Sequence, residues 1–114
     1  MRDDRQRLVD IVDATDLILK FVGEKTRSSA AGDPLLQSAI LYQLYVIGEA
    51  VARTSDSLRS RYSQVPWAQI QGFRNRVAHE YFKLDIDVIW ATVETEIPEL
   101  RKQIQSILAI EFPE

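Results

Sequence analysis

Apolar residues recur every three or four positions over residues 5–23, which is the spacing that places side chains on one face of an α-helix. Gly23 suits the end of this helix, and residues 24–32 have the composition of a loop. The pattern therefore predicts an amphipathic first helix followed by a loop. The stripe consists of Leu8, Ile11, Val12, Thr15, Ile18, Leu19 and Val22.

A second helix is predicted from Pro34 to about Ser57, because Asp33 can cap it and proline suits the first helical position. Residues 35–52 include no Lys or Arg, and Glu49 is their only acidic residue. A helix that is apolar nearly all round must be buried on most sides. We expect it to form the centre of a bundle and also a subunit interface, which predicts a two-fold homodimer.

The pattern breaks before Pro66, which opens a predicted third helix that ends at His79 or Tyr81. Asp85 resembles the N-cap of a last helix. Pro98 lies inside the apolar pattern of that helix, and it is expected to kink or split it because proline lacks an N–H group.

No segment shows the two-residue alternation of a strand, so the chain is predicted to be all-α. We expect an antiparallel bundle of four to five helices that forms a single domain over residues 1–114. With no Cys and one His, the chain has no disulfide framework, zinc finger or multi-histidine metal site, and neither metal nor cofactor is expected. No stretch approaches ~20 uninterrupted apolar residues, so we predict a cytoplasmic protein without membrane contact.

Charge is distributed unevenly along the chain. The formal net charge is −3, but residues 53–83 hold six basic and two acidic residues, a local net charge of +4. The remainder holds eight basic and fifteen acidic residues, a net charge of −7. The basic segment is either a solvated face or a local anion site.

The single histidine, His79, lies in the basic segment together with an amide, a phenol and arginines. On a helix, Asn75 and His79 share a face, and Arg74 flanks them. Arg74 suits a phosphate because its planar guanidinium stays charged and can donate to two oxygens. His79 suits proton transfer because imidazole changes its protonation near neutral pH. Structural roles are the alternative: His79 and Tyr81 can pack or cap, and Arg74 and Arg76 can pair with acids of neighbouring helices.

The run Arg74-Asn75-x-x-x-His79-x-Tyr81 resembles the R-x4-H-x-Y motif of the HEPN superfamily, and specifically of HepT-like toxins. The resemblance covers residues 36–108, and it implies a small all-helical dimer paired with an MNT-type minimal nucleotidyltransferase antitoxin. Other segments that resemble the pattern of this family are Ile47-Gly48-Glu49-Ala50, Pro66-Trp67, Ile89-Trp90 and Pro98-Glu99-Leu100.

The resemblance implies a role for each motif residue. Arg74 and His79 match the residues to which the family assigns ribonuclease action, and Asn75 matches the polar residue that follows the arginine. Tyr81 is similar to a tyrosine that the partner antitoxin adenylylates, which silences the toxin. Lys83 departs from the pattern, since many relatives have Gly there. Together with Arg76, it is a candidate substrate-binding residue.

These features predict the toxin of a type II toxin–antitoxin system, acting on RNA as a metal-independent endoribonuclease. Because each chain has one His, a two-fold dimer would supply both an acid and a base. The alternatives are a non-catalytic nucleotide- or RNA-binding helical module and a structural partner subunit of a nucleotidyltransferase. Glu49 is expected to pair either with a motif arginine or with a core tyrosine, and the structural pairing is preferred.

Overall fold

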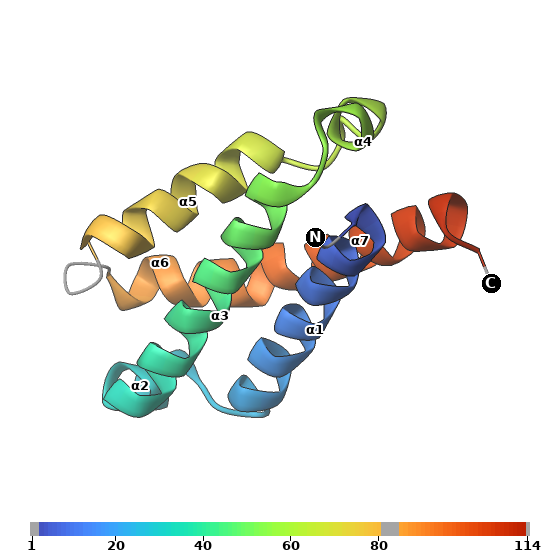
Figure 1. Cartoon of the computed structure of the whole chain (residues 1–114). Coiled ribbons are helices and arrows are strands. Elements are labelled where there is room, and N and C mark those ends of the chain that lie inside the picture. The colour runs from blue at the N-terminus through green and yellow to red at the C-terminus, as the bar shows by residue number, and fades with distance from the viewer. Residues whose placement is uncertain (1–2, 81–84, 114) are drawn as a thin grey trace.

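The computed structural model describes residues 3–80 and 85–113, with the backbone alone for residue 80. Every element in this part of the chain is a helix, so the predicted all-α class is confirmed (Figure 1). The elements are α1 (Asp4–Val22), α2 (Arg27–Ala31), α3 (Pro34–Arg53), α4 (Asp56–Arg61), α5 (Trp67–Glu80), α6 (Ile86–Ala91), the π-helical η2 (Thr92–Glu96) and α7 (Ile97–Glu111).

Four long helical units build the molecule: α1, α3, α5 and the continuous run from α6 through η2 to α7. In Figure 1, α1 and α3 lie side by side and run in opposite directions, and α5 crosses α3 on the side away from α1. The α6–η2–α7 run passes behind α3, and α7 then crosses α1, which it contacts. A helical bundle is therefore present, but the described residues form more helices than the four to five predicted, because the short helices α2 and α4 lie between its long members.

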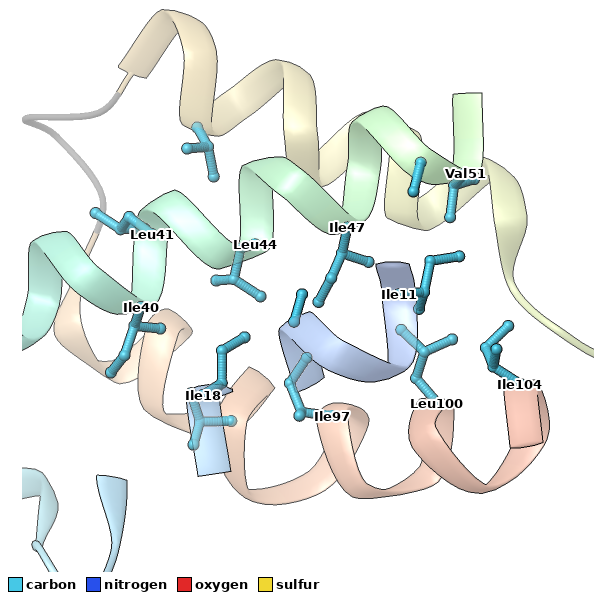
Figure 2. Close-up of a cluster of buried hydrophobic side chains, with 14 of the residues drawn as sticks. Ile11, Ile18, Ile40, Leu41, Leu44, Ile47, Val51, Ile97, Leu100 and Ile104 are labelled. Atoms are coloured by element: carbon cyan, nitrogen blue, oxygen red, sulfur yellow. The ribbon is translucent and has the colours of Figure 1, made fainter. Parts of the chain in front are cut away.

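The core lies where α3 faces α1 and α7. Figure 2 shows isoleucine and leucine side chains from these three helices pointing toward one another. Burying such side chains contributes about 1.5–3 kcal/mol each to the free energy of folding. The core members labelled there are Ile11, Ile18, Ile40, Leu41, Leu44, Ile47, Val51, Ile97, Leu100 and Ile104, all no more than 6% exposed.

Helix α3 begins as predicted, with Pro34 in its first turn and the Asp33 carboxylate accepting a hydrogen bond from the Leu36 N–H at 3.0 Å. By length and composition alone this 20-residue helix could cross a membrane, at a mean hydropathy of 1.3. Close to half of that apolar window, 44%, is buried inside the fold. Its contacts with α1 and α5 are those of a core helix.

The second helix ends earlier than predicted, at Arg53 instead of about Ser57. The Thr54 hydroxyl donates to the Ala50 carbonyl at 2.9 Å, and the Ser55 hydroxyl then accepts from the Leu58 N–H at 3.2 Å to start α4. The Asp4 carboxylate holds this turn by accepting from the Ser55 N–H at 2.9 Å. A contact from the distant start of α1 thus holds the turn that separates α3 from α4 within the polar run 53–57.

The predicted loop over residues 24–32 contains the short helix α2. Thr26 and Ser29 form a capping box at its start, each side chain bonding to the other residue's backbone N–H. Arg27 forms an ion pair with Asp87, which ties α2 to α6. Helices this short are not stable alone, so tertiary contacts decide whether they form.

Pro98 neither breaks nor ends the last helix; it lies in the first turn of α7, immediately after the π-helical turn η2. At the end of η2, the Ile97 N–H donates to the Thr92 carbonyl, five residues back. A wider turn accommodates a residue that has no N–H and whose ring crowds the preceding turn. The predicted distortion is present as a local widening, and the helix continues to Glu111.

Candidate functional site

Helix α5 carries the motif residues, and its first turn is anchored to α4. The Trp67 side chain is buried, and its indole N–H lies 3.1 Å from the Arg59 carbonyl and 3.0 Å from the Tyr62 carbonyl. Both carbonyls belong to the end of α4, so one indole donor joins the two helices. Further along α5, Val77 is buried and Phe73 packs against the core. These contacts fix which side of α5 faces inward.

Helices α3 and α5 cross at Gly48, where Arg74 lies directly against the α3 backbone. A Cβ added to Gly48 would lie 2.2 Å from the Cβ of Arg74 and 2.5 Å from its Cγ, far inside van der Waals contact. Only a glycine permits an approach this close. The crossing therefore fixes the start of the Arg74 side chain.

The residue after Gly48 completes the setting of Arg74. Glu49 Oε1 lies 3.3 Å from Arg74 Nε, and Glu49 Oε2 lies 3.4 Å from an Nη atom of Arg53. The Arg74 and Glu49 side chains are 27% and 29% exposed, so this ion pair is largely removed from water. Glu49 thus pairs with a motif arginine, and the preferred expectation that it pairs with a core tyrosine was wrong. A tyrosine–glutamate hydrogen bond does occur elsewhere, where the Tyr62 hydroxyl donates to Glu111 at 2.6 Å.

Asn75 and His79 lie on the opposite, exposed side of α5. Because α5 is helical through Glu80, these two residues share a face as predicted. His79 lies about 140° around the helix axis from Arg74, at about 100° per residue. The structure therefore places the amide and imidazole together in solvent, and it turns the guanidinium toward α3.

Arg76 is exposed, and its guanidinium lies 5.8 Å from the centre of the Phe73 ring in a cation–π arrangement. Tyr81 and Lys83, predicted as the modified tyrosine and a substrate-binding residue, lie outside the described residues.

Ion pairs reduce the positive charge of the basic segment. Arg59 pairs with Asp56 on α4, and Arg61 pairs with Glu111 at the end of α7. Arg53 and Arg74 share the single carboxylate of Glu49, so these three residues together keep a net charge of +1. Among these pairs, a net positive charge remains at the crossing of α3 and α5.

A groove of about 630 Å³ lies beside α5, between this helix and the η2–α7 segment. Its floor is apolar, and Glu96 and Glu99 line its edge. An apolar groove with acidic edges is a poor match for an RNA backbone. The described residues contain no group of three or more acidic or histidine side chains suited to hold a metal ion. The apolar floor includes Leu44, Ile47, Ile70, Phe73, Ile97 and Leu100.

Glu49 is the site residue whose role sequence reasoning did not assign correctly. The sequence did indicate that Glu49 has a partner, because it is the only acid on an apolar helix and a buried charge needs one. The identity of that partner depends on where α5 crosses α3, which no local pattern shows.

Comparison of the sequence with known proteins shows the family to which the chain is similar. The family model described as ribonuclease HepT-like matches residues 11–107. A protein of Caldanaerobacter subterraneus subsp. tengcongensis, provisionally named an RNase, is 36% identical over 95% of this chain and 96% of its own length. A provisionally named RNase of Methanocaldococcus jannaschii is 31% identical over 94% of this chain and 92% of its own.

A protein of Thermococcus cleftensis, provisionally named ribonuclease HepT, is 29% identical over 93% of this chain and 96% of its own length. No solved structure matches the chain. The match of the family model over most of the chain and the relatives of nearly equal length agree, and the chain belongs to the HepT-like ribonuclease family of the HEPN superfamily.

Proposed function

We propose that this protein is the toxin of a type II toxin–antitoxin system and cleaves RNA as a metal-independent endoribonuclease in the cytoplasm. The observation that carries the proposal is the setting of Arg74, whose half-buried side chain is fixed at the α3–α5 crossing. The exposed His79 follows five residues later on the same helix. Membership of the HepT-like ribonuclease family supports the same activity.

The reaction needs a base, a charge stabiliser and an acid. A neutral His79 takes the proton of a ribose 2′-OH, and the 2′ oxygen attacks the neighbouring phosphorus. Arg74 stabilises the negative charge that develops on the phosphoryl oxygens. The bond from phosphorus to the 5′ oxygen breaks, and that oxygen takes a proton from a second, protonated imidazole. The products are a 2′,3′-cyclic phosphate and a 5′-hydroxyl. Asn75 orients His79 or holds a phosphate oxygen.

Two copies of the chain are proposed to form each active site. Within one chain, His79 and Arg74 point to different sides of α5, and the single His cannot be both acid and base. Leu35, Tyr42 and Glu49 follow one another at seven-residue intervals on α3, so they form one stripe that drifts by about 20° per step. Leu35 is 81% exposed and Tyr42 is 62% exposed. A second copy that covers this apolar stripe would come to lie beside Arg74.

Cleavage of a labelled single-stranded RNA by the purified chain in EDTA tests the activity. Wild type is expected to cleave, and His79→Ala is expected to lose about 10²–10⁴-fold in rate because it lacks the proton-transfer group. Arg74→Ala should lose a comparable factor, since its charge stabilisation is removed. Circular dichroism checks that both variants remain folded.

The same assay separates the alternatives. Wild-type RNA binding without cleavage, unchanged in His79→Ala, would favour a non-catalytic nucleotide- or RNA-binding module. The absence of both binding and cleavage would favour a structural partner subunit of a nucleotidyltransferase. Cleavage that survives His79→Ala at the wild-type rate would exclude the mechanism.

We further propose that an MNT-type nucleotidyltransferase antitoxin silences the toxin by transferring AMP to Tyr81. The added phosphodiester anion would compete with RNA for Arg74, and the nucleoside would block access. Mass spectrometry of the chain co-expressed with that partner should show a mass increase of one or more AMP groups, which Tyr81→Phe removes. An unmodified Tyr81 in an inactive complex would instead indicate steric blocking.

A further inference from the structure

The Glu49 carboxylate lies between two arginines that differ in exposure. On its inner side it contacts Nε of Arg74, whose side chain is 27% exposed. On its outer side it contacts Arg53, whose side chain is 59% exposed. The inner contact is therefore the one that is shielded from solvent screening.

Arg74 Nε is itself removed from solvent, and it has no aligned hydrogen-bond acceptor among the described residues. A buried N–H without an acceptor is unfavourable. At 3.3 Å, Glu49 Oε1 is close enough to accept this N–H after a small rotation of either side chain. The pair is thus an ion pair that can tighten into a charge-assisted hydrogen bond.

We propose that Glu49 is a positioning residue for Arg74, holding its Nε so that the two terminal amino groups are directed to the RNA phosphate. A guanidinium is planar, so an acceptor on Nε fixes the direction of the opposite edge, which binds two phosphate oxygens. Gly48 fixes the start of the same side chain through its contact with the Arg74 Cβ. This inference rests on the proposed ribonuclease function.

Glu49 has opposite effects on binding and on catalysis. The cluster of Glu49, Arg53 and Arg74 has a net charge of +1, and without the carboxylate it would be +2. Removing the carboxylate therefore raises the attraction for RNA while it releases Arg74. A residue with a purely structural role would lower binding and turnover together.

The test compares Glu49→Gln and Glu49→Asp in kcat and in RNA affinity. Glu49→Gln is expected to bind RNA at least as tightly as wild type and to lose about 10–100-fold in kcat, because small displacements of a catalytic group have such effects. Glu49→Asp keeps the charge but is one methylene shorter, so its affinity should stay unchanged while kcat falls. Glu24→Gln, an exposed acid after α1, is the charge-matched control and should leave kcat unchanged.

Thermal unfolding measured by circular dichroism identifies any effect of misfolding on these values. An unchanged kcat in Glu49→Gln, or a parallel loss of kcat and affinity in a folded variant, would overturn the positioning role.

A readout without turnover keeps the inference testable if wild type does not cleave RNA, which would reject the proposed function alone. In 15N-labelled protein, the Nε–Hε signal of Arg74 is assigned by its absence in Arg74→Lys. Wild type should show this signal protected from solvent exchange, and a short RNA should shift it. Glu49→Gln should lose the protection. Equal protection in both proteins would show that burial alone shields the Arg74 Nε–H group, and it would overturn the positioning role whatever the activity of the protein.

Discussion

At the α3–α5 crossing, one missing methyl group determines how closely the motif helix approaches the core. A Cβ at position 48 would lie 2.2 Å from the Cβ of Arg74, so Gly48→Ala must push the helices apart. We expect a loss of about 1–3 kcal/mol in the free energy of unfolding, as for other overpacked sites. The rate of RNA cleavage should also fall in the protein that remains folded, because the displaced residue is Arg74. Urea unfolding and the cleavage assay measure the two effects.

Gly72 provides the matched control on α5. A Cβ added there meets no atom within 4 Å, and the residue lies inside a helix, where glycine costs about 0.5–1 kcal/mol relative to alanine. Gly72→Ala should therefore raise the free energy of unfolding by about that amount. If both alanine variants changed stability in the same direction, the close crossing would not be the reason for glycine at position 48.

The sequence identified the motif residues but not their environment. Arg74, Asn75 and His79 could be selected because a short spacing on one helix concentrates three useful chemical groups. The contact between Glu49 and Arg74 joins residues 25 positions apart, and it depends on the close approach that Gly48 permits. No local periodicity encodes that approach, so the acid was assigned to a tyrosine.

Among the elements, α4 is joined to the end of α7 by a polar contact that depends on pH. Glu111 accepts from the Tyr62 hydroxyl at 2.6 Å and from the Arg61 guanidinium at 2.7 Å. The Tyr62 hydrogen bond, and then that of Arg61, lower the pKa of the Glu111 carboxyl below its ordinary value of 4.5. A carboxyl whose pKa is lowered in the folded state stabilises that state above the unfolded pKa. The contribution is lost as pH falls through the folded pKa.

Glu111→Gln should therefore lower the melting temperature at pH 7, and the difference from wild type should shrink as pH falls below 4.5. Melting curves recorded at steps of about one pH unit from about pH 3 to pH 8 measure this difference, since carboxyl groups titrate at the lower end of that range. Glu24→Gln, which removes an exposed acid elsewhere, serves as the control. A difference that stayed constant with pH would show that the carboxylate's ionisation is not what joins α4 to α7.

One side-chain donor, the Trp67 indole N–H, joins the start of α5 to the end of α4. Trp67→Phe keeps most of the buried ring but removes the indole N–H that bonds to the Arg59 and Tyr62 carbonyls. We expect a loss of about 0.5–1.5 kcal/mol in unfolding free energy, because the indole hydrogen bond is lost while each carbonyl keeps a backbone N–H donor. Chemical denaturation measures it. A variant as stable as wild type would show that packing alone anchors the helix.

The helices could be predicted where sequence carries its own start signal. Asp33-Pro34 and Asp85 cap α3 and α6 through local side-chain hydrogen bonds, and both starts are confirmed. The short helices α2 and α4 were not predicted, although Thr26 and Ser55 cap them locally. Segments of five and six residues do not form on a cap alone, and they depend on contacts such as Arg27 with Asp87 and Ser55 with Asp4. Those partners lie 60 and 51 residues away in the chain.

At the scale of the whole molecule, an acidic protein has a small positive site. Most of the described arginines of the basic segment are paired with acids, and the cluster at the α3–α5 crossing keeps a net charge of +1. Weak overall attraction to RNA follows from the net charge of −3. Affinity would then depend on shape and on a second copy of the site more than on bulk charge.

The proposed dimer makes this dependence measurable. Tyr42 and Ile110 are both 62% exposed, but Tyr42 lies on the α3 stripe that leads to Glu49, and Ile110 lies near the end of α7. Tyr42→Arg should convert a dimer into a monomer, because a desolvated charge without a partner opposes burial of the stripe. Ile110→Arg should leave the dimer intact. Light scattering after gel filtration measures the mass of each variant.

Cleavage should follow the oligomeric state, because each site needs an acid and a base and each chain has one His. Tyr42→Arg should therefore lose activity at concentrations where it is monomeric and recover part of it at high protein concentration. Ile110→Arg should match wild type throughout. Full activity in a monomeric Tyr42→Arg would show that one chain holds a complete site, and the second proton-transfer group would then have to come from water or from the RNA itself.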